Sequence, residues 1–299
     1  MTEMAGTKEI KTHIESVRET RKITNAMYLI ASTKLRRARA DLDNTRPFFQ
    51  ALRKEIKRIF RTANDVTSHY FYPVGNDTPL QGTYACLVIT ADKGLAGAYN
   101  QNAIREALRL LDQHPDTKLF VVGEYGRRFF SQHHIPIERS FLYTAQNPTM
   151  ARAREISALL LDGFDQGELK EIFVVYTDME SAMSFRARSA RLLPFHRTYF
   201  ETSAGEGALT ETFEFLPNIT SVLNNMIQSY VSGYIYSALI DSFCCEQNAR
   251  MTAMDSANQN AEKLLGDLSL QYNRVRQSAI TQEITEVSAG ARAQRQRKE

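Results

Sequence analysis

Both ends of the chain carry a heptad pattern of apolar residues that continues far beyond the length of an ordinary globular helix. Between Ile10 and Ile59 the spacing alternates between four and three residues over fifteen positions, and twelve of these are apolar. Such a narrow stripe is typical of a coiled-coil seam rather than of the broader apolar face of a globular helix. The seam positions are Ile10, Ile14, Val17, Arg21, Thr24, Tyr28, Ala31, Leu35, Ala38, Leu42, Thr45, Phe49, Leu52, Ile56 and Ile59.

A second seam lies near the carboxyl end, in a segment that contains no proline after Pro217. Its positions are Met254, Asn258, Ala261, Leu265, Leu268, Tyr272, Val275 and Ala279. A helix of ~70 residues is roughly 105 Å long, several times the diameter of a small domain. Only the other terminal helix is long enough to bury such a seam. The sequence therefore predicts a rod built from the two chain ends.

Between the two seams, short apolar runs alternate with amphipathic segments. The predicted strands are Tyr84–Thr90, Lys118–Gly123, Ile135–Tyr143, Glu171–Thr177 and a more polar edge strand, Ala182–Leu193. The predicted helices are Asn100–Asp112, Arg127–Phe130 and Pro148–Leu161. Apolar strands that are separated by helices indicate a mostly parallel sheet covered on both faces.

These elements divide the chain into five parts of a mixed α+β and α/β fold. The expected parts are a coiled-coil helix (1–62), a linker (63–82), a Rossmann-like α/β domain (83–200), a second linker (201–216), and a coiled-coil helix with a basic tail (217–299). Both linkers are rich in glycine, proline or polar residues. Pro47 should kink the first helix or start a new helical stretch, because it lacks a backbone donor.

The charge of the chain is concentrated at its amino end. Residues 1–62 hold 15 Lys and Arg against 7 Asp and Glu, a net of +8, so the whole-chain charge of +3 leaves −5 for the remainder. The run from Lys34 to Arg39 places Lys34, Arg36, Arg37 and Arg39 outside the seam. This basic band is either a solvated helix face or the counterpart of an acidic protein surface. Nucleic acid is less favoured, since neither a base-reading helix nor stacking aromatic residues accompany the band.

Other features of the composition favour a reduced, soluble chain that could still attach to a membrane complex. Cys86, Cys244 and Cys245 form no disulfide framework. The longest apolar runs fall short of the ~18 residues that a membrane span requires. The amino end resembles neither a signal peptide nor a transit peptide.

The loop from Thr90 to Gly97 lies between a predicted strand and a predicted helix, where phosphate-binding loops occur. Its two glycines, however, match neither the dinucleotide-binding nor the P-loop pattern. We favour a tight turn in which Asp92 and Lys93 are surface charges at an interface.

The adjacent His133 and His134 lack a spaced third ligand for a metal. The sequence contains no nucleophile, metalloprotease or Cys/His motif, which counts against an enzyme.

Near the carboxyl end, Val275 and Ala279 continue the seam while Arg274, Arg276 and Gln277 project at other angles. These three polar residues are either ordinary helix surface or a contact ring where the tip of the rod meets a surrounding protein.

Several segments resemble the ATP synthase gamma subunit family, in the same order along the whole chain. Near the amino end these are KEI at 8–10, SV at 16–17, KITNAM at 22–27, KLRRA at 34–38 and RP at 46–47. In the middle, ITADKGLAGAYN at 89–100 is similar to the family's central-domain loop. Near the carboxyl end the similar segments are ARMxAMxxAxxNA from 249 and YNxxRQxxITxEI from 272.

The resemblance implies the central rotor shaft of F1. The terminal helices would form an antiparallel coiled coil inside a ring of alternating alpha and beta subunits, and the Rossmann-like domain would lie at the base with the epsilon subunit and the c ring. Such a rotor couples ion-driven rotation of the c ring to conformational changes in the beta subunits, or pumps ions when ATP is hydrolysed. It has no catalytic site, cofactor or metal of its own, and one copy serves each complex.

The resemblance also assigns contact roles to residues of this chain. Met27 and the Lys34–Arg37 region match positions that pass the acidic lever segment of beta. Arg276 and Gln277, with Arg274 beside them, match contacts with a loop of beta. The sequence differs from the family at Leu216-Pro217-Asn218, which lacks the acid often found there, and in the basic tail after Gly290.

The chloroplast-type cysteine insertion is absent, which favours a bacterial protein at the cytoplasmic face of the cell membrane. Two other classes remain as alternatives at this point. One is a Rossmann-like enzyme with a ligand at the Asp92–Gly97 turn, and the other is a coiled-coil scaffold that associates with itself through its seams.

Overall fold

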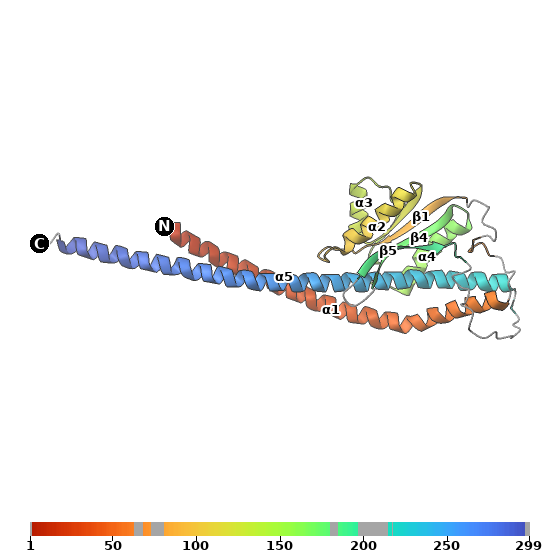
Figure 1. Cartoon of the computed structure of the whole chain (residues 1–299), viewed down its shortest axis with the longest axis horizontal. Helices are drawn as coiled ribbons and strands as arrows, with labels where there is room; N and C mark the ends of the chain where they lie inside the picture. The colour runs from red at the N-terminus through yellow and green to blue at the C-terminus, as the bar shows by residue number, and fades with distance from the viewer. Residues whose placement is uncertain are drawn as a thin grey trace. The chain divides into compact units, whose positions relative to one another are not determined.

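The structure is a computed structural model that describes residues 2–62, 68–72, 81–179, 185–196, 215–216 and 218–296 (Figure 1). The chain divides into two units. Unit 1 consists of residues 1–31 and 251–299, and unit 2 of residues 32–250. Most of the two predicted linkers, 63–82 and 201–216, falls outside the described residues.

The two terminal seams form long helices, as predicted. Helix α1 spans Thr2–Thr62 and helix α5 spans Ile219–Gln296. Of the fifteen predicted seam positions in α1, only Arg21 is exposed, and all eight in α5 are buried or half-buried. Helix α1 continues through Pro47, so this proline does not start a new helix. Because Pro47 is exposed, water can satisfy the carbonyl that its missing N–H leaves unpaired.

In unit 1, the two helices pair in an antiparallel direction. Thr24 donates a hydrogen bond to Asn258, and Arg21 forms an ion pair with Glu262 at 2.8 Å. From Thr24 to Arg21 the residue number falls along α1, while that of the contacting residue rises along α5 from Asn258 to Glu262. The two helices therefore run antiparallel. The apolar seam continues around these polar residues with Ile14 on α1 and Leu268 on α5, both of which are buried.

Unit 2 contains a five-stranded sheet in the order β3-β2-β1-β4-β5. The strands are β1 (Thr83–Ile89), β2 (Thr117–Val122), β3 (Arg139–Phe141), β4 (Leu169–Met179) and β5 (Phe185–Leu193). The first four strands run parallel, and β5 pairs antiparallel with β4 at an edge. This arrangement confirms the mostly parallel sheet with a more polar edge strand. The third predicted strand, Ile135–Tyr143, is a strand only at its centre, because Pro136 has no backbone donor and His134 and Tyr143 have positive φ.

Helices cover both faces of this sheet (Figure 1). They are α2 (Tyr99–Gln113), α3 (Glu124–Gln132), α4 (Met150–Asp165) and the part of α5 that belongs to unit 2. Side chains of α2 and α3 pack on one face in a core that includes Cys86, Ile104 and Phe130. On the other face the Ser242 hydroxyl of α5 accepts a hydrogen bond from the backbone of Thr177 in β4. This part of α5 is therefore buried on several sides, unlike an isolated coiled-coil helix.

Helix α5 approaches α1 closely in unit 2 at Gly233. A Cβ atom at this position would lie 1.8 Å from a ring carbon of Phe49. We expect Gly233→Ala to destabilise the chain by about 1–3 kcal/mol, because the ring must move out of a packed site. Gly266→Ala is the matched control, since nothing lies within 4 Å of its Cβ.

The control should stabilise the chain by up to about 1 kcal/mol, the usual gain when glycine is replaced inside a helix. Urea unfolding followed by circular dichroism measures both changes. Equal changes in the free energy of unfolding for Gly233→Ala and Gly266→Ala would show that the helices do not approach each other at Gly233.

Candidate partner-contact surfaces

In unit 1, the contact residues expected on α5 are exposed. Arg274, Arg276 and Gln277 project from the helix surface, and no ion pair of Arg274 or Arg276 occurs within the described residues. Positions 280–292 are all exposed, so this end of α5 has no cover from α1. The arrangement leaves two guanidinium groups beside an uncovered helix end, where they can reach another protein.

The free surface of unit 1 is also more apolar than the sequence reasoning recognised. Ile23, Leu29 and Ile30 of α1 are 57–61% exposed, and Ile284 of α5 is 62% exposed. The expected contact residue Met27 lies among the α1 residues and is half-buried. The sequence contained a signal for this apolar surface, because these side chains are apolar and lie outside the seam. Exposed apolar groups of this kind mark a protein-contact surface.

In unit 2, the basic band lies where the seam predicts. Leu35 and Ala38 are buried on the seam, which turns the charged side chains outward. The exposed members are Lys34, Arg36, Arg37 and Arg39. Arg39 also donates to the sulfur of Met179 at 3.6 Å. The band is thus a row of accessible cations on a fixed helix face.

The loop after β1 is held by several internal hydrogen bonds. The Thr90 hydroxyl donates to the carbonyl of Val122 at 2.8 Å, and the amide oxygen of Asn100 accepts from the backbone of Ala91 at 2.9 Å. Leu95 adopts a positive φ of 62° and is 65% exposed. The expected contact residue Lys93 is also exposed. The loop therefore presents a charged and an apolar side chain from a fixed backbone.

The Asp92 carboxylate lies at the amino terminus of α3 and not at that of α2, the helix that follows its own loop. Its Oδ1 atom accepts a hydrogen bond of 2.8 Å from the backbone of Glu124, at the start of α3. Helix amino termini attract anions, and here the chain's own carboxylate takes that place. Gly123 permits the turn, since a Cβ atom there would lie 2.2 Å from the Thr90 carbonyl oxygen. Asp92 is only partly accessible, so it positions the loop more than it offers a surface charge.

A buried ion pair joins this loop to α5, and sequence reasoning missed it. Arg250 donates to the carbonyl oxygens of Lys93 at 3.3 Å and Gly94 at 3.1 Å. It also pairs with Glu246, and the two side chains are only 11% and 8% exposed. Burial raises the pKa of Glu246, while Arg250 opposes this rise. The four-residue spacing of the acid and the arginine on one helix was the available signal.

The basic band and the loop therefore meet at one place on α5. The charge of Lys34 lies near enough to Glu246 to favour its ionised form, and Glu246 in turn pairs with Arg250. Arg250 then holds the backbone of Lys93. Lys34 and Lys93 are far apart in the chain, and the spacing of residues could not predict that both lie near the Glu246–Arg250 pair.

The remaining candidate residues, the adjacent histidines and the three cysteines, all belong to unit 2. His133 lies at the end of α3, where its ring stacks on Phe129 and contacts that residue's carbonyl. No cluster of three metal-binding side chains occurs in the described part of the chain. The three cysteines are buried thiols. No described helix has the length and apolar character of a membrane span.

The chain matches a known family over almost its entire length. A family model described as ATP synthase covers residues 6–294. An ATP synthase gamma chain from Ruminiclostridium cellulolyticum is 39% identical, with 96% of this chain and 98% of that protein covered. The sodium ion specific ATP synthase gamma chain from Acetobacterium woodii is 35% identical, with coverage of 95% and 97%.

Solved structures agree with the fold. A chain of the Euglena gracilis mitochondrial ATP synthase, in a structure of OSCP, F1 and the c ring, matches with a TM-score of 0.68 and 18% identity. The alignment covers 97% of this chain and 94% of that one. A chain from the rotor of the same enzyme matches with a TM-score of 0.62 and 17% identity, covering 92% and 99%. With the family match over residues 6–294 and the identity to gamma chains over nearly the full length, this chain belongs to the ATP synthase gamma-chain family.

Proposed function

We propose that this chain is the central rotor of a rotary ATP synthase and that its exposed cations are the points through which torque passes. The antiparallel helix pair of unit 1, with its uncovered carboxyl end, is the observation that carries the proposal. A stiff pair of helices can turn as one body inside a ring. Rotation driven by ion flow through the c ring then orders the release of ATP, and hydrolysis drives the reverse rotation.

The physical basis of coupling is the asymmetry of the shaft. One orientation presents different side chains to each of the surrounding beta subunits, so it stabilises a different conformation in each. A shaft can shift these conformations only by the difference in its contact free energy with them. Exposed ion pairs contribute about 0–1 kcal/mol each. Torque must therefore be shared among many contacts, which include the basic band, the loop at Lys93 and the arginines near Arg276.

The proposal assigns no catalytic site to this chain. Catalysis belongs to the beta subunits in a ring of alternating alpha and beta subunits. The base of the rotor, in unit 2, contacts the epsilon subunit and the c ring. One copy of the chain serves each complex, which lies at the cytoplasmic face of a bacterial cell membrane and is peripheral to it.

The assembly itself provides the direct test. The affinity-tagged full chain should purify with alpha and beta subunits in about threefold excess over itself, as a closed ring around one shaft requires. Purification as a self-associated oligomer without them would instead support the scaffold class. Calorimetric titration of the isolated chain with ATP tests the enzyme class, and the rotor proposal expects no binding heat.

Arg276→Ala should lower the rate of ATP synthesis without preventing assembly. Arg276 is exposed on α5, so its loss removes a surface contact and leaves the packing of the helix intact. We expect a reduction of about twofold to fivefold, the effect of one exposed ion pair. Synthesis by the assembled complex in energised vesicles measures it.

Arg105→Ala is the matched control, because Arg105 is another exposed arginine, on α2 rather than on the rod. It should leave the rate unchanged. A failure of the Arg276 variant to assemble would show that this residue supports the structure and does not transmit torque.

A further inference from the structure

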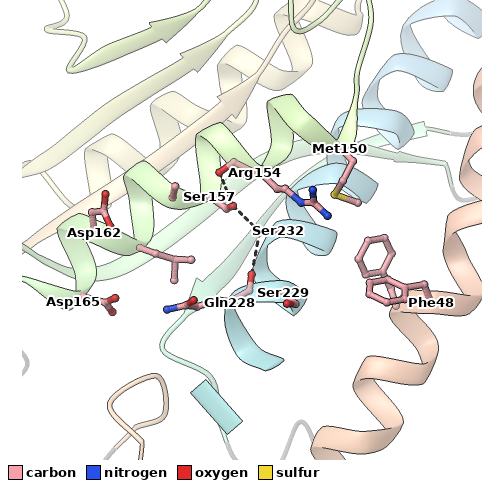
Figure 2. A pocket seen from close by; sticks show the side chains of 12 residues that line it. Phe48, Met150, Arg154, Ser157, Asp162, Asp165, Gln228, Ser229 and Ser232 are labelled. Carbon is pink, nitrogen blue, oxygen red and sulfur yellow. Dashed lines mark hydrogen bonds between the residues drawn. The ribbon is translucent and has the colours of Figure 1, made fainter. Parts of the chain in front are cut away.

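Unit 2 has an open groove that none of the expected contact surfaces includes (Figure 2). It lies between α4, α5 and the Phe48 region of α1, and its cavity volume is about 350 Å³. Asp162 and Asp165 lie at one end of the groove, and Met150 and Phe48 at the other (Figure 2). All of these residues belong to unit 2.

Small hydroxyl side chains form the floor of the groove. The hydroxyls of Ser157 on α4 and Ser232 on α5 are 2.7 Å apart in a hydrogen bond. One hydroxyl donates to the other, and the hydroxyl that accepts donates its own proton to a backbone carbonyl 3.0 Å away, that of Gln228 for Ser232 or that of Arg154 for Ser157. The floor is therefore satisfied internally and needs no ligand for its polar groups. Its small side chains leave space above the two helices that a larger side chain can fill.

An exposed aromatic ring forms one wall. Phe48 is 59% exposed, although its ring packs edge-on against Phe49 at a centroid distance of 5.3 Å. Met150 lines the same end of the groove. An aromatic ring and a methionine beside an open cavity provide an anchor point for an apolar side chain of another protein.

The two ends of the groove carry opposite charges. Arg154 extends across it toward the Phe48 end, and no ion pair of Arg154 occurs in the described part of the chain (Figure 2). Asp162 is exposed at the other end, eight residues further along α4. Asp165 is already engaged, because it pairs with His69 at 2.8 Å and accepts from Tyr70. Eight residues of helix correspond to roughly 12 Å between Arg154 and Asp162.

We propose that this groove binds an amphipathic helix of a partner protein. The bound helix places an apolar side chain against Phe48 and Met150, an acidic side chain toward Arg154, and a basic side chain about eight residues away toward Asp162. A helix fits better than a strand, because the floor is the seam between two helices and offers no open strand edge. The charge pattern sets the direction of the bound helix.

Photo-crosslinking in the full-length chain, in the cells that produce it, tests the proposal. A p-benzoylphenylalanine is placed at Ala158, which is exposed and lines the groove. The matched control is the same substitution at Ala151, which is exposed on α4 outside the groove. The cross-linked peptide is identified by mass spectrometry. We expect a helical segment of another protein that carries the acid, the apolar residue and the base at the stated spacing, and only from position 158.

Charge reversal provides the second measurement. Arg154→Glu should reduce the yield of the cross-link at Ala158 about threefold to fivefold, the value of one exposed ion pair. Changing the partner's acid to lysine should restore the yield. Arg152→Glu is the control, because Arg152 is exposed on α4, lies outside the groove and pairs with Glu155. It should not change the yield.

Three outcomes overturn the proposal: a cross-link from Ala158 to this chain itself, a partner segment without the predicted charge pattern, or no product above that of Ala151. Each of these leaves the rotor assignment untouched, because the groove is separate from the basic band, the loop at Lys93 and the Arg276 region.

Discussion

Replacing Arg250 by methionine should destabilise the chain by about 3–5 kcal/mol, the usual cost of breaking a buried ion pair by removing one partner. Glu246 would remain buried without its countercharge, and the carbonyls of Lys93 and Gly94 would lose their donor. Urea unfolding of the full chain, followed by the near-ultraviolet circular dichroism of its tyrosines, measures the loss. Tyr99 packs in the same cluster as Ala249 and reports on this region.

The stability lost in the Arg250→Met variant should be larger at pH 8 than at pH 5. Without Arg250, burial raises the pKa of Glu246 further, and protonation at low pH then removes the unpaired charge. Adding Glu246→Gln to the variant should recover part of the stability at pH 8. Arg128→Met is the control, since Arg128 also pairs with a glutamate but is 71% exposed, and it should cost no more than about 1 kcal/mol. Equal losses of stability in the Arg250→Met and Arg128→Met variants would contradict the burial of the Arg250–Glu246 pair.

Asp241→Asn should stabilise the chain above pH 6 and have little effect near pH 4. Burial, followed by the nearby charge of Asp178, raises the pKa of Asp241 to about 6, although Arg46 and a hydrogen bond from Ser237 oppose the shift. The folded state therefore holds this proton more strongly than the unfolded state, in which the pKa is 3.8. As the pH rises from about 4 through 6, the wild-type chain loses a contribution of at most about 3 kcal/mol. The asparagine variant has no proton to lose.

The difference in unfolding free energy between the variant and the wild type should therefore grow between pH 4 and pH 7. Carbon-detected NMR titration of the Asp241 carboxyl group provides an independent midpoint. Asp178→Asn should shift that midpoint downward, because it removes the neighbouring negative charge. An unfolding difference that stays constant with pH would show that Asp241 is not buried beside Asp178.

The parts of the fold that follow from local periodicity could be predicted from the sequence. A seam residue such as Leu35, which is buried in the structure, shares one helix face with the apolar residues three and four positions away. This shared face follows from the spacing alone, whichever element covers it. The strand at Glu171–Thr177 was evident because it is apolar on both faces, as a strand inside a covered sheet must be. The exposed basic band follows from the same periodicity.

The pairings between distant segments could not be predicted in this way. Arg250 holds the backbone of residues more than 150 positions away, and backbone carbonyls leave no mark in the sequence. Asp241 has a raised pKa because the fold buries its carboxyl group and brings Asp178 beside it. The groove beside Phe48 likewise exists because three helices leave a space at their meeting point.

By itself, the sequence determined two long terminal helices, a covered parallel sheet between them, and the faces that each helix buries, because these depend on residue spacing along a single element. Only the tertiary structure decided that Glu246 lies near the charge of Lys34 while its partner Arg250 holds the Lys93 loop, and that the Arg154 groove stays open. The physical reason is that burial, ion pairing and cavity shape depend on distances between elements, and the packing of the whole chain sets those distances.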